Sequence, residues 1–254
     1  MVAAVALAWG ATGWVLSSWL APLALWQEYR VRSEAFGTAV LYHLLLVGGA
    51  VGASLVLGTA IALAMRRSRR LERAGFTLLN LVQTIPSLAL FGLLLAPLAW
   101  LAANVGWLHA LGVRGIGWAP AFLALLGYSL LPMVRNTFVA LSGVEAGVLE
   151  AARGMGMSRA QVFWQVRLPL ALPVVLEGIR ITTVQAIGLA AVAALVGAGG
   201  LGTFIFQGLG QAAMDLVLLG ALPILAMALA ADALLGALSR RLSPQENRSH
   251  GGAG

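Results

Sequence analysis

The chain has 254 residues, of which 60% are hydrophobic and 10% are charged, and it contains no cysteine. Soluble domains carry about 25% charged residues, so this composition predicts a membrane protein without disulfides or thiolate metal sites. All 16 basic residues are arginines, and a chain without lysine has no Walker A loop, which argues against a P-loop ATPase. The arginines lie in short clusters between apolar stretches, a pattern typical of membrane topology rather than of nucleic-acid binding.

The first apolar stretch, residues 1–26, is long enough to cross a bilayer, and residues 27–38 form a polar connector. A cleaved signal peptide is the alternative, but no basic residue precedes the apolar run, and we favour a retained span. A second span is predicted over residues 39–65. It ends at five arginines within eight residues, Arg66, Arg67, Arg69, Arg70 and Arg73.

A third span is predicted over residues 76–103, and its first half carries several hydrogen-bonding side chains and a proline. Polar groups in lipid are costly unless they are paired or face a cavity, and a proline within a helix bends it. The cluster therefore predicts either a hinge that lines a pathway or hydrogen bonds between helices. Its members are Asn80, Gln83, Thr84, Pro86 and Ser87.

Residues 104–118 are predicted to form an outer-face loop, and a fourth span over 120–139 contains Asn136 near its end. The polar segment that follows, residues 150–169, has the sequence EAARGMGMSRAQVFWQVRLP. It predicts a helix, a turn at the permissive Gly156, and a second helix. A capping box of Ser158 and Gln161 would open the second helix, and Pro169 would close it.

A fifth span over residues 170–196 contains Glu177 and Arg180, which are three residues apart and so share one helical face. We prefer a structural ion pair that braces the helix bundle, with a role in transport as the alternative. The last span covers residues 213–238, with Asp232 nearer its inner end. The polar tail, residues 239–254, is predicted to be disordered.

A glycine-rich stretch, GAGGLG, separates the last two spans and formally matches a dinucleotide-binding fingerprint. It follows a membrane span instead of a strand, and no acidic residue lies about 20 positions on. We therefore predict a hinge on the outer face, formed by Gly197, Gly199, Gly200 and Gly202.

The arginine distribution predicts the topology. With six spans, 12 of the 16 arginines fall on the side of residues 150–169 and three fall opposite, at Arg30, Arg32 and Arg114. Because arginine-rich loops stay in the cytoplasm, this bias places both residues 150–169 and the C-terminus there.

Residues 150–169 resemble the EAA loop of the permeases of bacterial ABC importers. The likeness rests on Glu-Ala-Ala, on Gly156, and on the Leu-Pro at the family's spacing; Val166 stands where the family has isoleucine. An ordinary cytoplasmic helical hairpin is the alternative. The stretches QTIPSLAL, LLPMVRNT, LPLALPVVLEGIR and GAGGLG extend the resemblance over residues 39–238, and together they look most like permeases for osmoprotectants.

The resemblance implies an all-α, polytopic helical bundle in the bacterial cytoplasmic membrane. It implies a five-span permease core over residues 39–238, an N-terminal span and connector over 1–38, and a cytoplasmic tail over 239–254. The partners would be a pair of ABC ATPase subunits, a second permease subunit of the same or a related chain, and an extracytoplasmic substrate-binding protein. Partner ATPases would bind the ATP and magnesium, so this chain would be no enzyme and hold no cofactor or metal.

The resemblance also implies which residues contact the ATPase. In the family the EAA loop docks into a cleft of that subunit, and here the loop would transmit force rather than catalyse. The residues carried over are Glu150, Ala151, Ala152, Gly156, Val166, Leu168 and Pro169. The expected solute is glycine betaine, choline or carnitine.

Other functions stay open at this stage. An importer for methionine, another amino acid or a phosphonate would share the general fold. A stand-alone secondary transporter or a channel is a different class, but such proteins usually show inverted repeats or intramembrane acids for a coupling ion, which we do not find here. A purely structural membrane scaffold would leave the EAA-like segment without an explanation.

Overall fold

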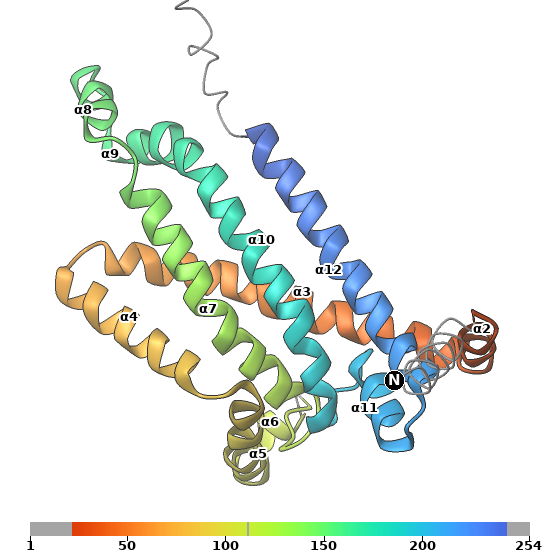
Figure 1. Ribbon diagram of the computed structural model, residues 1–254. Helices are drawn as coiled ribbons and strands as arrows, with labels where there is room; N and C mark the ends of the chain where they lie inside the picture. Colours follow the sequence, from red (N-terminus) through yellow and green to blue (C-terminus); the bar gives the residue numbers. More distant parts are fainter. Residues whose placement is uncertain (1–21, 111, 243–254) are drawn as a thin grey trace, which may run out of the picture. The chain divides into compact units, whose positions relative to one another are not determined.

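The computed structural model describes residues 22–110 and 112–242, and each element in these ranges is helical (Figure 1). Most of the predicted first span and the tail beyond residue 242 lie outside the described residues. In chain order the elements are α2 Pro22–Val31, α3 Ser33–Met65, α4 Arg69–Thr84, α5 Ser87–Asn104, α6 Gly106–Ala110, α7 Trp118–Ser142, α8 Ala146–Gly154, α9 Arg159–Gln161, the π-helix η1 Val162–Arg167, α10 Leu168–Val192, the 3-10 helix η2 Ala193–Val196, α11 Gly202–Gln211 and α12 Met214–Leu242.

Five described helical stretches are long and apolar enough to cross a membrane, which confirms the predicted all-α membrane fold. They are Ser33–Met65, Ser87–Asn104, Trp118–Ser142, Arg159–Val196 and Met214–Leu242. The connector predicted over residues 27–38 is largely helical, because α3 already begins at Ser33. The last span likewise continues to Leu242, four residues into the stretch predicted as a disordered tail.

The single span predicted over residues 76–103 is wrong. The chain forms two helices there, and Ile85, with φ −71° and ψ 126°, leaves the α region directly before Pro86. The first of them, α4, is an amphipathic helix whose first half carries three arginines, and only the second, α5, is apolar and long enough to cross a membrane. Pro86 therefore ends a helix instead of bending one.

The chain divides into two compact units, each assembled from three stretches. The first contains Met1–Val47, Leu88–Leu123 and Ile187–Met227, and the second contains Gly48–Ser87, Ala124–Ala186 and Ala228–Gly254. The boundaries fall within α3, α7, α10 and α12 and directly after Ser87, the first residue of α5, and the EAA-like segment lies entirely in the second unit.

The first unit has a core where α11 and the start of α12 pack on the start of α3. Leu201, Phe204, Leu216 and Leu219 are buried there against Ala39. Aromatic rings of α2 and α3 pack on the same cluster. The apolar side chains of this core fix the short helix that follows the glycine-rich turn.

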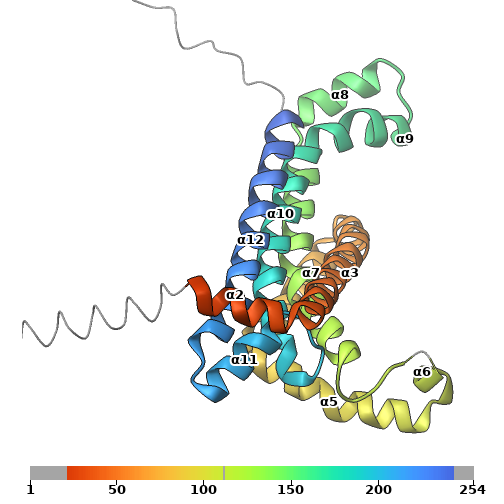
Figure 2. The same cartoon turned by 90° about the vertical axis from the view of Figure 1, so that its right-hand side faces the viewer.

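Among its described residues, the second unit holds three apolar clusters. One joins α3, α4 and α7, and another joins α7 and α10. The third lies within the polar segment itself, between α8 and η1. Figures 1 and 2 both show α8 and α9 side by side, beyond the ends of α7 and α10. The two long helices thus carry the segment at their ends.

Candidate functional site

The EAA-like segment is a helical hairpin with a glycine at its turn. Helix α8 runs over Ala146–Gly154, and Gly156 adopts φ +84°, the left-handed conformation that favours glycine. Ser158 accepts a hydrogen bond from the backbone N–H of Gln161, whose side chain accepts one from the backbone N–H of Ser158. The predicted helix, glycine turn and capping box are all confirmed. We call Ala146–Arg167 the EAA hairpin.

The EAA hairpin has an apolar interior of its own. Leu149 and Ala152 of α8 are buried against Val162 of η1, and Val166 packs on the same cluster. Ala152 is only 2% exposed, so its side chain is not part of the outer surface of the hairpin. Residues 150, 151 and 152 point in successive directions around the helix, and only Ala152 points inward.

The outer surface of α8 is therefore formed by Glu150 and Ala151, which are both exposed. Gly156 is exposed as well, and a Cβ added there would meet no atom within 4 Å. Its conformation, and not a lack of space, is what calls for glycine at this turn. The small exposed side chain of Ala151 leaves this side of the hairpin open to close approach.

The hairpin is joined directly to a membrane-crossing helix. The prediction that Pro169 ends the second helix is wrong, because the helix continues through the π-helical η1 into α10 and is helical over Arg159–Val196. A proline in a regular α-helix clashes with the carbonyl four residues before it. The wider winding of η1, where the N–H of Leu168 bonds to the carbonyl of Phe163, changes that spacing just ahead of Pro169.

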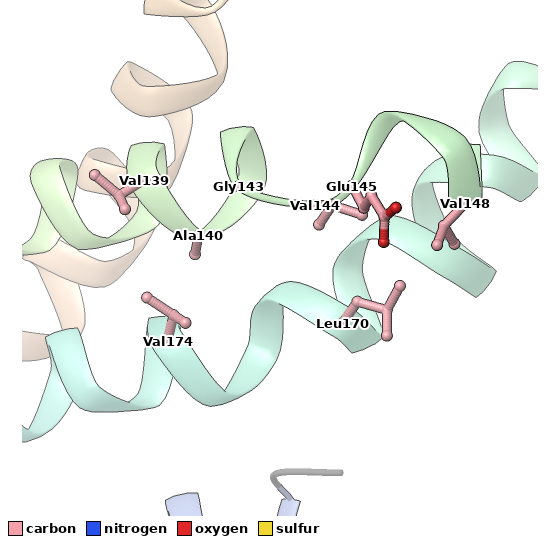
Figure 3. A pocket seen from close by; sticks show the side chains of 8 residues that line it. All are labelled: Val139, Ala140, Gly143, Val144, Glu145, Val148, Leu170 and Val174. Carbon is pink, nitrogen blue, oxygen red and sulfur yellow. The ribbon is translucent and has the colours of Figure 1, made fainter. Parts of the chain in front are cut away.

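A pocket of about 380 Å³ lies at the base of the hairpin. Figure 3 shows α7 and the start of α8 on one side, with Leu170 and Val174 of α10 on the other. Its lining is apolar except for the carboxylate of Glu145, which points into it. The pocket lies where α8 leaves the membrane-spanning helices.

The polar residues predicted near Pro86 do not form one cluster. Gln83 donates a hydrogen bond of 2.9 Å to the carbonyl of Tyr128, and the Tyr128 hydroxyl donates to the carbonyl of Ile85. Asn80 and Thr84 are exposed on α4, and Ser87 begins α5. The role of Tyr128 was not predicted, because a single polar atom within an apolar span gives no signal.

Asn136 lies on α7 away from that group, and it faces α10. Its side-chain amide donates to the carbonyl of Pro132 at 2.8 Å. A Cβ added at Gly178 of α10 would come within 2.5 Å of the Asn136 Cβ, so the two helices approach closely here. Asn136 thus occupies a tight helix crossing, where a small partner residue is needed.

Arg180 lies at the centre of a group of three charges. Its guanidinium is 3.3 Å from Glu177 on the same helix, and it makes two shorter hydrogen bonds, of 2.7 and 2.8 Å, to Asp232 of α12. The sequence predicted the pairing of Glu177 with Arg180 but not the contact with Asp232. An aspartate within the last span was the available signal, but its partner is 52 residues away.

The glycine-rich turn follows η2 in the first unit. Gly197, Gly199 and Gly200 all have positive φ, between 74° and 83°. Gly202 begins α11, and a Cβ there would lie 1.9 Å from the carbonyl oxygen of Ala191. The predicted turn thus requires glycine at several positions, three for conformation and one for space.

The described residues contain no group of three or more histidine, aspartate or glutamate side chains that could hold a metal ion. What the segments above offer is a helical hairpin attached to a membrane-crossing helix, with an exposed outer surface. Such an arrangement can transmit movement to the membrane-spanning part.

The model of one protein family matches residues 54–244, and its description is "Binding-protein-dependent transport system inner membrane component". The chain belongs to this family. This permease is therefore a membrane component of a transport system, as the resemblance of its EAA hairpin predicted.

Three relatives are similar in sequence to this permease over most of their own length. Osmoprotectant import permease protein OsmW of Salmonella typhimurium is 40% identical over 207 residues, which are 80% of this chain and 89% of the relative. Glycine betaine/carnitine/choline transport system permease protein OpuCD of Bacillus subtilis is 38% identical over 204 residues, which are 80% of this chain and 82% of the relative. Carnitine transport permease protein OpuCB of Listeria monocytogenes is 36% identical over 199 residues, which are 77% of this chain and 84% of the relative.

Solved structures share the permease fold. An inward-facing methionine ABC transporter, MetNI, superposes with a TM-score of 0.69 at 21% identity, covering 84% of this chain and 98% of that chain. An amino acid ABC transporter with histidines superposes with a TM-score of 0.66 at 20% identity, covering 85% of this chain and 97% of that chain. At these identities the likeness concerns the fold alone.

Proposed function

We propose that this permease forms the translocation path for a quaternary ammonium osmoprotectant such as glycine betaine, choline or carnitine. The observation that carries the proposal is the identity of 36–40% to three permeases whose names specify these solutes or osmoprotectants in general. The methionine transporter shares the fold at 21% identity, which gives no support to methionine as the solute.

We propose further that transport is driven by a separate pair of ABC ATPase subunits, which bind the ATP and magnesium. A second permease subunit and an extracytoplasmic binding protein complete the importer. The chain itself contributes no catalytic group. The arginine bias supports an orientation in which the EAA hairpin and the C-terminus are cytoplasmic, so that the hairpin meets the ATPase.

In this proposal the EAA hairpin is the coupling element. Exposed Glu150 and Ala151 contact the ATPase, while Ala152 and Val166 hold the hairpin together from inside. Gly156 sets its turn. Leu168 and Pro169 begin α10, so a displacement of the hairpin passes along one continuous helix.

Arg180 extends that coupling to a second helix. Because it bonds Asp232 on α12 while it belongs to α10, both helices move together when the hairpin is displaced. The transport cycle is then a change of population between inward- and outward-facing states, which ATP binding to the partner biases.

The remaining polar and glycine residues would serve the path. We assign Gln83, Thr84, Pro86 and Ser87, with Asn80, to a gate at the break between α4 and α5, and Asn136 to the crossing of α7 and α10. The glycine-rich turn from Gly197 to Gly202 serves as the outer hinge.

The test is reconstitution of the permease in liposomes with the ATPase and binding protein of its own transport system. We expect ATP-dependent uptake of radiolabelled choline, glycine betaine or carnitine, and none without the ATPase. Uptake of methionine in place of all three solutes would contradict the substrate assignment, and uptake without any ATPase would contradict the importer.

A further inference from the structure

A second pocket, of about 230 Å³, lies within the EAA hairpin and is lined mainly by arginines. Arg153 comes from the last turn of α8, Arg159 is the first residue of α9, and Arg167 is the last residue of η1. Val162 and Phe163 supply the rest of the lining. Three positive charges from three elements thus converge on one cavity.

These three arginines have no acidic partner. Over residues 22–110 and 112–242 the ion pairs involve Arg32 and Arg180, and no carboxylate lies within 4.0 Å of Arg153, Arg159 or Arg167. The Nε of Arg167 is also buried without a hydrogen-bond acceptor. A buried charged donor without an acceptor is costly, so this atom indicates an anion as the natural occupant.

The surrounding charge has the same sign. Arg66, which follows α3 and is partly buried, has its pKa lowered, first by burial and second by the positive charge of Arg167. A fourth guanidinium therefore lies within the electrostatic reach of the pocket. An anion placed between these groups would relieve their mutual repulsion.

We propose that Arg153, Arg159 and Arg167 form a binding site for a phosphate-bearing anion. Guanidinium groups bind phosphate oxygens through two parallel hydrogen bonds, which is why arginine is favoured at such sites. One water needs only about 15 Å³ of such space, so 230 Å³ accommodates a phosphate group together with water. Phe163 and Val162 would contact the apolar part of the ligand.

Two sources could supply this phosphate. Arg167 lies near the start of Arg159–Val196, a helical stretch long and apolar enough to cross a membrane, and basic pockets beside membrane-spanning helices bind the head groups of anionic lipids. A soluble phosphate compound could reach the same site from the water side. This site goes beyond the proposed function. It rests on that proposal in one respect, namely that the pocket lies on the cytoplasmic side of the membrane.

The experiment uses the full-length permease in nanodiscs of phosphatidylcholine. One arm titrates inorganic phosphate at constant ionic strength and follows the midpoint of thermal unfolding. The other arm adds phosphatidylglycerol and counts bound lipids by native mass spectrometry. Tighter binding in the second arm would assign the site to lipid, and tighter binding in the first to a soluble anion.

Matched variants give the assignment. We expect Arg153→Gln, Arg159→Gln and Arg167→Gln each to weaken binding about tenfold. Arg167→Lys, which keeps the charge but loses the two-pronged geometry, should also weaken it. Arg73→Gln removes an exposed arginine of α4 outside the pocket and should leave binding unchanged. Arg159 is exposed, so we expect Arg159→Gln to fold. This variant therefore still tests the site if Arg167→Gln fails to fold.

Several results would overturn the site. Absence of binding by both probes would do so, and so would binding in all three glutamine variants that equals binding in the unchanged chain. Loss of ATPase association in these variants, without any phosphate binding, would show that the arginines pair with carboxylates of the ATPase. Because both probes are read on the permease alone, failure here leaves the proposed transport function untouched.

Discussion

The guanidinium of Arg180 donates two hydrogen bonds to the carboxylate of Asp232, from Nε to Oδ1 at 2.7 Å and from Nη2 to Oδ2 at 2.8 Å. This two-pronged geometry joins α10 to α12 across 52 residues of sequence. Glu177 accepts from the same guanidinium at the longer distances of 3.3 and 3.4 Å. Asp232 is therefore the stronger partner, although Glu177 is the nearer one in sequence.

The unequal distances predict unequal effects of substitution. Asp232→Asn should lower the midpoint of thermal unfolding more than Glu177→Gln, because it removes the charge from the two shorter bonds. The measurement is thermal unfolding of the purified permease in one detergent. Equal midpoints for the two variants would argue against the ranking.

Neighbouring alanines on α8 give a matched pair. Ala152→Leu should destabilise the EAA hairpin by about 1–3 kcal/mol, because its buried position has no room for a larger side chain. Ala151→Leu should leave unfolding unchanged but should weaken binding of the ATPase, because Ala151 is exposed. Unfolding and co-purification with the ATPase measure the two effects, and the reverse pattern would contradict the orientation of α8.

Glycines at the two ends of α11 give another pair. Gly202→Ala should abolish folding or expression, since its Cβ would lie 1.9 Å from the Ala191 carbonyl oxygen. At Gly210 a Cβ meets no atom within 4 Å, so Gly210→Ala should stabilise the protein by about 0.5–1 kcal/mol. Fluorescence-detected gel filtration compares them. A well-folded Gly202→Ala protein would show that the turn can adapt.

The hydroxyl of Tyr128 offers a test of the break at Pro86. Tyr128→Phe removes the hydrogen bond to the Ile85 carbonyl and should destabilise the protein by about 1 kcal/mol. Limited proteolysis should then cut between α4 and α5 sooner than in the unchanged chain. The control is Phe122→Tyr, because Phe122 lies outside the unit that contains Tyr128. Phe138 is unsuitable as a control position because it packs within that same unit.

The EAA hairpin was predictable because its signals are local. Glu150, Gly156 and the capping box of Ser158 and Gln161 lie within a dozen residues, so sequence spacing determines their geometry. The direction of Ala152 was not predictable in the same way. Its burial depends on Val162, across the turn, and an alanine is equally suited to either face.

The prolines show where local rules fall short. Pro86 was expected to bend a helix and instead ends one, because Ile85 before it leaves the α region and a new helix begins at Ser87. Pro169 was expected to end a helix, and the π-helical winding of η1 accommodates it. The Asp232 contact lay beyond prediction for another reason, since it depends on how two distant helices pack.

The central claim is that the EAA hairpin couples a separate ATPase to transport, and Glu150→Arg in the reconstituted importer tests it most directly. Glu150 is exposed, so the variant should insert and fold normally. Uptake and ATP hydrolysis are measured in the same liposomes, with Glu34→Arg, at an exposed position in the first turn of α3, as the control outside the hairpin. We predict that uptake is lost while hydrolysis becomes independent of the binding protein and solute; unchanged uptake per ATP hydrolysed would contradict the claim.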